Sequence, residues 1–187
     1  KEKLRFGVCA DVHKDIMHDA DERLQEFIDA AETEQLDFLI QLGDFCRPYN
    51  YNREFLSIWE SYSQNKYHVI GNHEMDGGTS REKAIEYRNM KTGYYSFEKK
   101  GFHFIVLDGN DKKDPEAKGY KQFIGPEQVE WLKAELAKTK VPVVIFSHQG
   151  LAHYSSADQE YGVENHKQIQ QMLEAHNSQY PRKKVVG

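Results

Sequence analysis

The stretch VIGNHEMD, residues 69–76, places three strongly polar residues directly after an apolar pair. The Val-Ile pair is typical of the end of a buried strand, whereas Asn72, His73 and Glu74 carry an amide, an imidazole and a carboxylate. A Gly-Asn turn accounts for the first residues after such a strand but not for the His-Glu that follows. The stretch therefore predicts a strand whose carboxyl end carries a chemical site.

The segments on both sides of this stretch alternate between strand-like and helix-like patterns. Apolar residues alternate or run continuously in the segments that we expect to be strands, which are 4–10, 37–42, 66–70, 94–98, 102–107, 141–146 and 183–187. They recur at helical spacing in the segments that we expect to be helices, which are 23–31, 54–62, 80–90, 125–137 and 165–176. This order predicts one α/β domain over residues 1–187 with a largely parallel core sheet.

Length and composition exclude several classes of protein. A chain of 187 residues that is 39% hydrophobic suits a single globular domain. The net charge is −5 and no run of Lys or Arg stands out, so the sequence carries no nucleic-acid footprint. No apolar run approaches the ~18 residues of a membrane span, so we expect a soluble chain. The sequence begins at Lys1 without a leader, so we expect a processed or trimmed product. The protein can then be cytoplasmic or exported, and the sequence leaves its oligomeric state open.

Unusual polar residues recur just past the carboxyl ends of the predicted strands. They are Asp11, His13, Asp44, Asn72, His73 and His148. Loops from several strands converge at that edge of an open α/β sheet, and ligands bind there. We therefore expect these side chains to form one site.

The chemistry of these side chains favours two divalent metal ions. Carboxylate, imidazole and amide groups together suit Mn, Fe or Zn better than Ca. Asp11 and His13 point the same way if the strand geometry persists, so both can bind one ion. Asn72 and His148 can bind a second ion, with Asp44 bridging the two. Two ions roughly 3.5–4 Å apart can clamp both the attacking and the leaving oxygen of a displacement at phosphorus.

The remaining candidate residues have roles beside the metals. His73 is the candidate proton donor to the leaving oxygen, and Glu74 is expected to orient His73 or to raise its pKa. Arg47 and His153 are candidate contacts to the substrate, Arg47 because a planar guanidinium suits a phosphate. Taken alone, DVH and GD are more often a turn cap or a surface histidine, whereas GNHE after an apolar strand is a stronger sign of a site. The co-occurrence of the motifs carries the argument.

Four motifs of the sequence resemble the first four metal motifs of the calcineurin-like metallophosphoesterases. They are ADVH at 10–13, LGDF at 42–45, IGNHE at 70–74 and FSHQG at 146–150, in the order of that family. The resemblance implies a two-sheet sandwich flanked by helices (α/β/β/α) with a dinuclear metal centre. It also implies the residue roles given above, with Asp44 as the bridging ligand and His73 as the catalytic histidine.

The resemblance also implies a fifth motif, Gly-His-x-His after a strand, which supplies one further histidine to each metal. Residues 183–187, KKVVG, look like that strand running into the glycine, and no other His-x-His occurs. We therefore expect the 187 residues to be a domain that is truncated at its C-terminal end.

The predicted function is hydrolysis of a phosphate ester on a small phosphorylated substrate. The core fits a monoester, a diester or a nucleotide pyrophosphate, cleaved by attack of a hydroxide that bridges the metals. Loops 46–53, 109–124 and 149–165 are expected to decide among these substrates. The alternative is a non-catalytic, metal-binding interaction module on the same fold, which would have no use for the proton donor His73.

The two cysteines are predicted to be free thiols. If Asp11 and Asp44 meet at one site, Cys9 lies two residues below its rim and Cys46 two residues above it. At about 3.3 Å per residue this separates them by roughly 13 Å, beyond the ~7 Å Cα limit of a disulfide.

Overall fold

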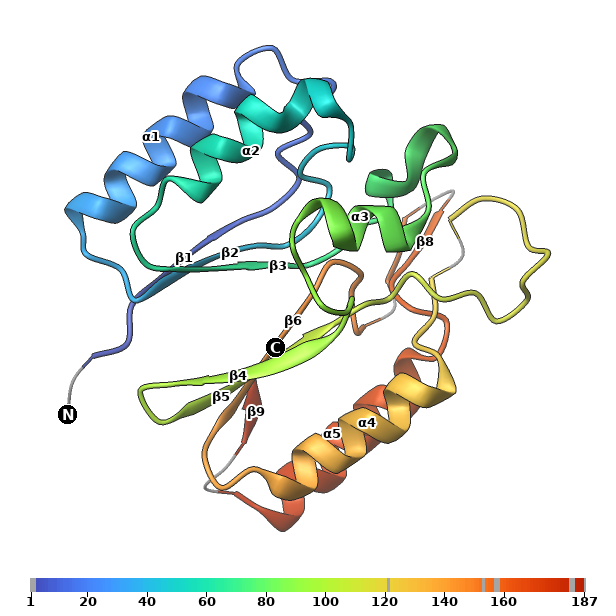
Figure 1. Cartoon of the computed structure of the whole chain (residues 1–187). Helices are drawn as coiled ribbons and strands as arrows, with labels where there is room; N and C mark the ends of the chain where they lie inside the picture. The colour runs from blue at the N-terminus through green and yellow to red at the C-terminus, as the bar shows by residue number, and fades with distance from the viewer. Residues whose placement is uncertain (1–2, 121, 153, 157–158, 182–183, 187) are drawn as a thin grey trace. The chain divides into compact units, whose positions relative to one another are not determined.

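The computed structural model describes residues 3–120, 122–152, 154–156, 159–181 and 184–186, and for the segments 154–156 and 159–161 it describes the backbone only. The chain divides into two compact units, which we call the first unit (Lys1–Thr92) and the second unit (Gly93–Gly187). Each unit contains a sheet flanked by helices (Figure 1). The predicted fold class, mixed α/β with two sheets flanked by helices, is therefore confirmed.

The first unit is built on a parallel three-stranded sheet in the order β1-β2-β3. Its strands are β1 (Phe6–Cys9), β2 (Phe38–Gln41) and β3 (Asn65–His68). Its helices are α1 (Ala20–Thr33), η1 (Asn50–Asn52), α2 (Arg53–Glu60), η2 (His73–Gly78) and α3 (Arg81–Tyr87). Helices α1 and α2 lie side by side on one face of this sheet (Figure 1).

The central strand β2 is buried at all four positions, as expected for a strand inside a parallel sheet. Leu39 of this strand packs in one apolar cluster with Ile28 of α1 and Trp59 of α2. The one polar residue of the strand, Gln41, is fully buried, and its amide is satisfied. It donates to Val69 O at 3.0 Å, lies 3.0 Å from His68 Nδ1, and accepts from Gly43 N at 2.7 Å. Gln41 therefore fixes the ends of β2 and β3, from which two of the candidate site loops leave.

The second unit is built on a mixed four-stranded sheet in the order β4-β5-β6-β9. Its elements are β4 (Tyr95–Lys99), β5 (Phe102–Leu107), α4 (Pro126–Lys138), β6 (Val143–Ser147), the hairpin β7 (Tyr154–Ser156) and β8 (Gln159–Tyr161), α5 (His166–Gln179) and β9 (Val185–Val186). β4 runs antiparallel to β5, and the other pairs of this sheet are parallel. The strands predicted at 94–98 and 102–107 are confirmed and pair with each other, whereas the β7–β8 hairpin was not predicted.

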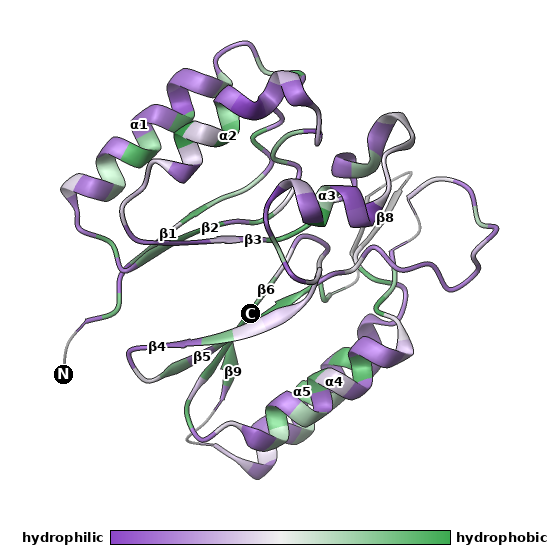
Figure 2. Ribbon diagram, viewed as in Figure 1, coloured by the Kyte–Doolittle hydropathy of each residue, from purple (hydrophilic) through white to green (hydrophobic). Residues whose placement is uncertain are grey.

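Each unit has its own apolar core beneath its helices. In the second unit, Leu132 of α4 and Ile169 of α5 are fully buried in a cluster with Ile105 of β5. Strands β2 and β5 are largely hydrophobic, β3 and β4 carry mostly hydrophilic residues, and the helices carry hydrophilic residues on their outer sides (Figure 2). None of the helices among the described residues has the length and hydropathy of a membrane span.

Cys9 and Cys46 are free, as predicted.

Candidate metal centre

Asp11 and His13 lie in the loop that follows β1, but not in strand geometry. β1 ends at Cys9, and both residues adopt positive φ angles, 53° for Asp11 and 49° for His13. The expectation that their side chains align because the strand continues is therefore wrong. Their positions are set instead by backbone hydrogen bonds to the loop after β2, from Asp11 N to Gly43 O (3.1 Å) and from His13 N to Asp44 O (2.9 Å).

These bonds bring three of the predicted metal ligands together. Ligand atoms of Asp11, His13 and Asp44 all lie within 4.8 Å of one another. His13 Nε2 is 3.8 Å from Asp11 Oδ1 and 3.7 Å from Asp44 Oδ2. The Asp44 side chain is buried, whereas that of Asp11 is 59% exposed. Two carboxylates and an imidazole facing one point fit a borderline divalent cation such as Mn, Fe or Zn.

His73 lies beside this cluster at the start of η2. Its backbone N–H donates to Asp44 Oδ1 at 2.9 Å, and its Nε2 is 3.9 Å from Asp44 Oδ2. Its ring meets that of His13 edge to face, with 5.2 Å between the ring centroids. The structure thus places the predicted proton donor next to three predicted ligands.

The remaining predicted ligands and contacts have different outcomes. Asn72 is half-buried and directly precedes η2, between Gly71 and His73. His148 directly follows β6 in the second unit and is described within that unit only. The ligand roles of both residues stay predictions. His153 lies outside the described residues.

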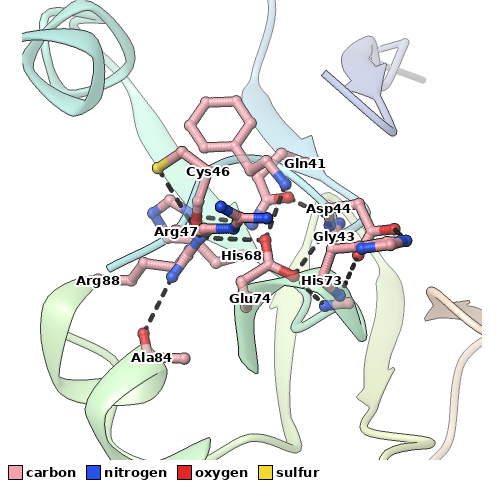
Figure 3. A network of polar contacts seen from close by, with 12 residues as sticks. Gln41, Gly43, Asp44, Cys46, Arg47, His68, His73, Glu74, Ala84 and Arg88 are labelled. Carbon is pink, nitrogen blue, oxygen red and sulfur yellow. Dashed lines mark hydrogen bonds and ion pairs between the residues drawn. The ribbon is translucent and has the colours of Figure 1, made fainter. Parts of the chain in front are cut away.

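Glu74 was expected to orient the His73 ring, but its carboxylate binds the backbone of two loops instead (Figure 3). Its carboxylate is buried and accepts hydrogen bonds from Gly71 N (2.9 Å), Asp44 N (3.0 Å) and Phe45 N (2.7 Å). One carboxylate therefore fastens the loop after β3 to the loop that carries Asp44. The expectation that Glu74 orients His73 is wrong, because these backbone donors, together with Arg88, take its oxygens.

Arg88, at the end of α3, balances the buried charge of Glu74. Its Nη2 lies 3.0 Å from Glu74 Oε1 and also donates to Cys46 O at 2.6 Å, while its Nη1 donates to Ala84 O at 3.2 Å (Figure 3). Neither Arg88 nor Glu74 has an exposed side chain. The sequence analysis did not identify Arg88. The available sign was its spacing of four residues from Ala84, which places this arginine on the buried side of the predicted helix.

A carboxylate that does contact the His73 ring is that of Asp76, which the sequence analysis missed. His73 Nδ1 lies 2.8 Å from Asp76 Oδ2. Arg47 Nη2 lies 3.3 Å from the same oxygen. An available sign was the Asp76-Gly77 pair, which is typical of a turn that folds back on the preceding residues.

A small hollow that is open to solvent lies against this cluster. It is lined by residues from three loops, 13–16, 44–47 and 73–76. His13, Asp44 and His73 are on its wall, and so is Arg47, the predicted substrate contact. The arrangement can hold a cation, an anionic group beside it, and a proton donor within one small space.

The sequence model of the calcineurin-like phosphoesterases matches residues 4–177, which is most of the chain. The protein belongs to the calcineurin-like phosphoesterase family. No curated protein matches the chain in sequence.

Solved structures share the fold of this calcineurin-like phosphoesterase at low sequence identity. A dimetal phosphatase from Danio rerio has a TM-score of 0.70 at 19% identity, over 98% of this chain and 79% of that one. A purple acid phosphatase from yellow lupin (Lupinus luteus) seeds has a TM-score of 0.53 at 18% identity, over 82% of this chain and 32% of that one. A protein of Thermus thermophilus has a TM-score of 0.56 at 15% identity, over 94% of this chain and 79% of that one. Family and fold support a phosphoesterase in general, without indicating its substrate.

Proposed function

We propose that this calcineurin-like phosphoesterase is a metal-dependent hydrolase that cleaves a phosphate ester of a small substrate. The observation that carries the proposal is the cluster of Asp11, His13 and Asp44 with His73 beside it and Arg47 on the wall of the same hollow. A cation site, an anion-binding side chain and a proton donor are the parts that hydrolysis of a phosphate ester requires.

Two divalent ions, Mn, Fe or Zn, are the proposed cofactors. Asp11 and His13 would hold one ion, Asn72 and His148 the other, and Asp44 would serve both. When bound, such ions polarise phosphoryl oxygens and lower the pKa of a water molecule. The buried Asp44, fixed by the backbone bonds of its neighbours, supplies a negative charge that does not have to reorganise when a cation enters.

His73 is the proposed general acid. Asp76 holds Nδ1 of its ring, so the other nitrogen, Nε2, is the one that faces the cluster, 3.9 Å from Asp44 Oδ2. A proton on Nε2 can therefore pass to the leaving oxygen of an ester bound at the cluster. Arg47, on the wall of the same hollow, offers a planar set of donors to the phosphoryl oxygens.

Turnover assays test this proposal. The substrates are para-nitrophenyl phosphate, its bis ester and a nucleotide diphosphate sugar, each with added Mn²⁺ and with metal content measured by elemental analysis. We expect hydrolysis of at least one substrate, lost in Asp44→Asn together with bound metal. Hydrolysis that is unaffected by removal of the metal, or by Asp44→Asn, would overturn the proposal.

A matched pair of histidine variants tests the role of His73. His73→Asn should keep the bound metal and lower turnover by roughly 10²- to 10⁴-fold. His166→Asn makes the same chemical change at the start of α5 and should leave turnover intact. Protein that binds metal but turns over none of the three substrates would instead favour the non-catalytic interaction module.

A further inference from the structure

One carboxylate oxygen, Asp76 Oδ2, is shared between the proposed general acid and the proposed phosphate-binding side chain. His73 Nδ1 lies 2.8 Å from this oxygen, and Arg47 Nη2 lies 3.3 Å from it. All three residues line the hollow, and their side chains are partly exposed, 19% for Asp76 and about twice as much for the other two. Asp76 is therefore placed where a bound substrate can change which partner it has.

The backbone of η2 explains how Asp76 reaches both partners. The helical path breaks at Asp76, which has extended angles (φ −60°, ψ 152°), and Gly77 follows with a φ of 70°. This turn folds the Asp76 side chain back over His73, three residues earlier. A side chain at Gly77 would be strained by its φ and would meet Tyr49 Oη at 2.8 Å, so glycine is required there.

The two partners of Asp76 are held very differently. His73 has its backbone N–H bound to Asp44 Oδ1 and makes the shorter contact to Asp76. Arg47 is anchored through its backbone, whose N–H donates to Asp15 Oδ2 at 2.7 Å and whose carbonyl accepts from Asn52 Nδ2 at 3.0 Å, while its guanidinium makes the longer contact to Asp76. A doubly charged phosphoryl group in the hollow offers Arg47 a stronger, bidentate partner than one shared carboxylate oxygen.

We propose that Asp76 is a positioning residue that couples phosphate binding at Arg47 to the orientation of His73, an inference that rests on the proposed function. With the hollow empty, Arg47 and His73 share Asp76. When Arg47 turns its donors to a phosphoryl group, Asp76 Oδ2 is released from Arg47, and its contact with His73 Nδ1 fixes the ring with Nε2 toward the leaving oxygen. Substrate binding then completes the geometry for proton transfer.

Glu74 illustrates why a similar role is not assigned to the other carboxylate of this loop. Glu74 is 1% exposed, and three backbone N–H groups and Arg88 surround it. Glu74 also lines the hollow, but its carboxylate is held by backbone donors and a buried guanidinium, which cannot turn to a ligand. Asp76 differs because it contacts the side chains of His73 and Arg47, and both of these side chains line the hollow.

Kinetics with two leaving groups separate positioning from simple structural support. We expect Asp76→Asn and Asp76→Ala to lower kcat by roughly 10- to 100-fold for an alkyl phosphate, whose leaving oxygen needs a proton, in the range seen for supporting residues around a site. For 2,4-dinitrophenyl phosphate, which departs unaided, kcat should change by less than about threefold. The matched control Asp29→Asn, at an exposed site on α1, should leave both values unchanged.

The coupling itself is measured by a double-mutant cycle on the alkyl phosphate. Arg47→Ala should raise KM for both substrates, and it should not lower kcat through His73, because the contact of Asp76 with His73 is kept. In the wild type, part of the energy of the contact between Arg47 and the phosphoryl group is used to release Arg47 from Asp76. The rise in KM caused by Arg47→Ala should therefore be larger in the Asp76→Ala background, where Arg47 is already released. Equal fold-changes in KM in the two backgrounds would overturn the coupling.

A measurement without turnover completes the test. The ¹⁵N shifts of the His73 ring in metal-free protein, assigned with His73→Asn, report which nitrogen carries the proton. In the neutral ring we expect Nδ1–H in the wild type and a shift toward Nε2–H in Asp76→Ala, because the bond at one nitrogen selects the tautomer. The general acid is the protonated ring, which carries a proton on both nitrogens. Equal losses with both leaving groups, or an unchanged tautomer, would reduce Asp76 to a structural residue and overturn the proposal. No turnover by the wild type with metal bound would instead refute the proposed function, and this inference with it.

Discussion

The carboxylate of Glu74 and the guanidinium of Arg88 form an ion pair of 3.0 Å in which neither side chain is exposed to solvent. The pair joins the end of α3 to the backbone at Gly71, Asp44 and Phe45. Asp44 is the central member of the candidate metal centre. The buried pair therefore holds the backbone that carries Asp44 and is not itself a metal ligand.

Removing Arg88 should strongly destabilise the first unit. Arg88→Met leaves the Glu74 charge buried without a counter-ion, which typically costs about 3–5 kcal/mol. The double variant Glu74→Gln/Arg88→Met should recover part of this loss, because the unpaired charge is gone. Urea unfolding measures both. The control is Arg23→Met in the exposed Asp19–Arg23 pair of the same unit, for which we expect a change below about 1 kcal/mol. Equal effects of Arg88→Met and Arg23→Met would contradict the burial of this pair.

Binding of a divalent cation should stabilise the protein through Asp11, His13 and Asp44. A ligand at 100 times its Kd stabilises the folded state by about 2.7 kcal/mol, so Mn²⁺ should raise the thermal midpoint and EDTA should reverse the rise. Asp44→Asn should abolish the response, whereas Asp29→Asn should keep it. Differential scanning fluorimetry across a Mn²⁺ titration gives both results. A full response in Asp44→Asn would place the cation elsewhere.

Stability should fall on acidification because of His68. Burial lowers the pKa of His68 below its usual value of 6.5, against the opposing effect of the Glu60 carboxylate 3.8 Å from Nε2. In the fold its Nδ1 pairs with the Gln41 amide nitrogen, which suits a neutral ring. Below pH 6.5 the unfolded chain therefore binds one more proton than the folded chain, and the stability present above pH 6.5 is lost as the pH falls toward the folded pKa.

Urea midpoints measured from pH 7 to pH 5 check this dependence. The contribution of His68 to the slope should reach at most about 1.4 kcal/mol per pH unit and should disappear in His68→Asn. The exposed His18 provides the control, since His18→Asn should retain the slope of the wild type. An identical slope in wild type and His68→Asn would show that His68 is protonated in the fold.

Both cysteine thiols should be unreactive in the folded protein. Burial raises the pKa of Cys9 and of Cys46 to about 12. At pH 8 only about one thiol in 10⁴ is then ionised, and the thiolate is the reactive form. Iodoacetamide should label neither cysteine within minutes in buffer and both in guanidinium chloride, as counted by intact mass. Rapid labelling in buffer would contradict this prediction. Labelling of the Cys9→Ser and Cys46→Ser variants would then show which thiol is accessible in the folded protein.

The sequence by itself determined the order of strands and helices and the positions of the polar motifs. Hydrophobic periodicity is a property of neighbouring residues, so it predicted β2 and α4 and placed Asp44 and His73 just after strands. The motifs predicted three ligands that the first unit brings together, Asp11, His13 and Asp44.

Only the tertiary structure decided how these residues are held and which charges pair. Asp11 and His13 turn out of strand geometry because their backbone bonds go to the loop of another strand, which no local pattern encodes. Glu74 was expected to orient His73, yet its carboxylate binds Arg88 and the backbone around Asp44. Asp76 contacts the His73 ring instead. Periodicity reports which face of an element is buried, whereas the partner of a charge depends on which loops meet in space, and folding alone determines that.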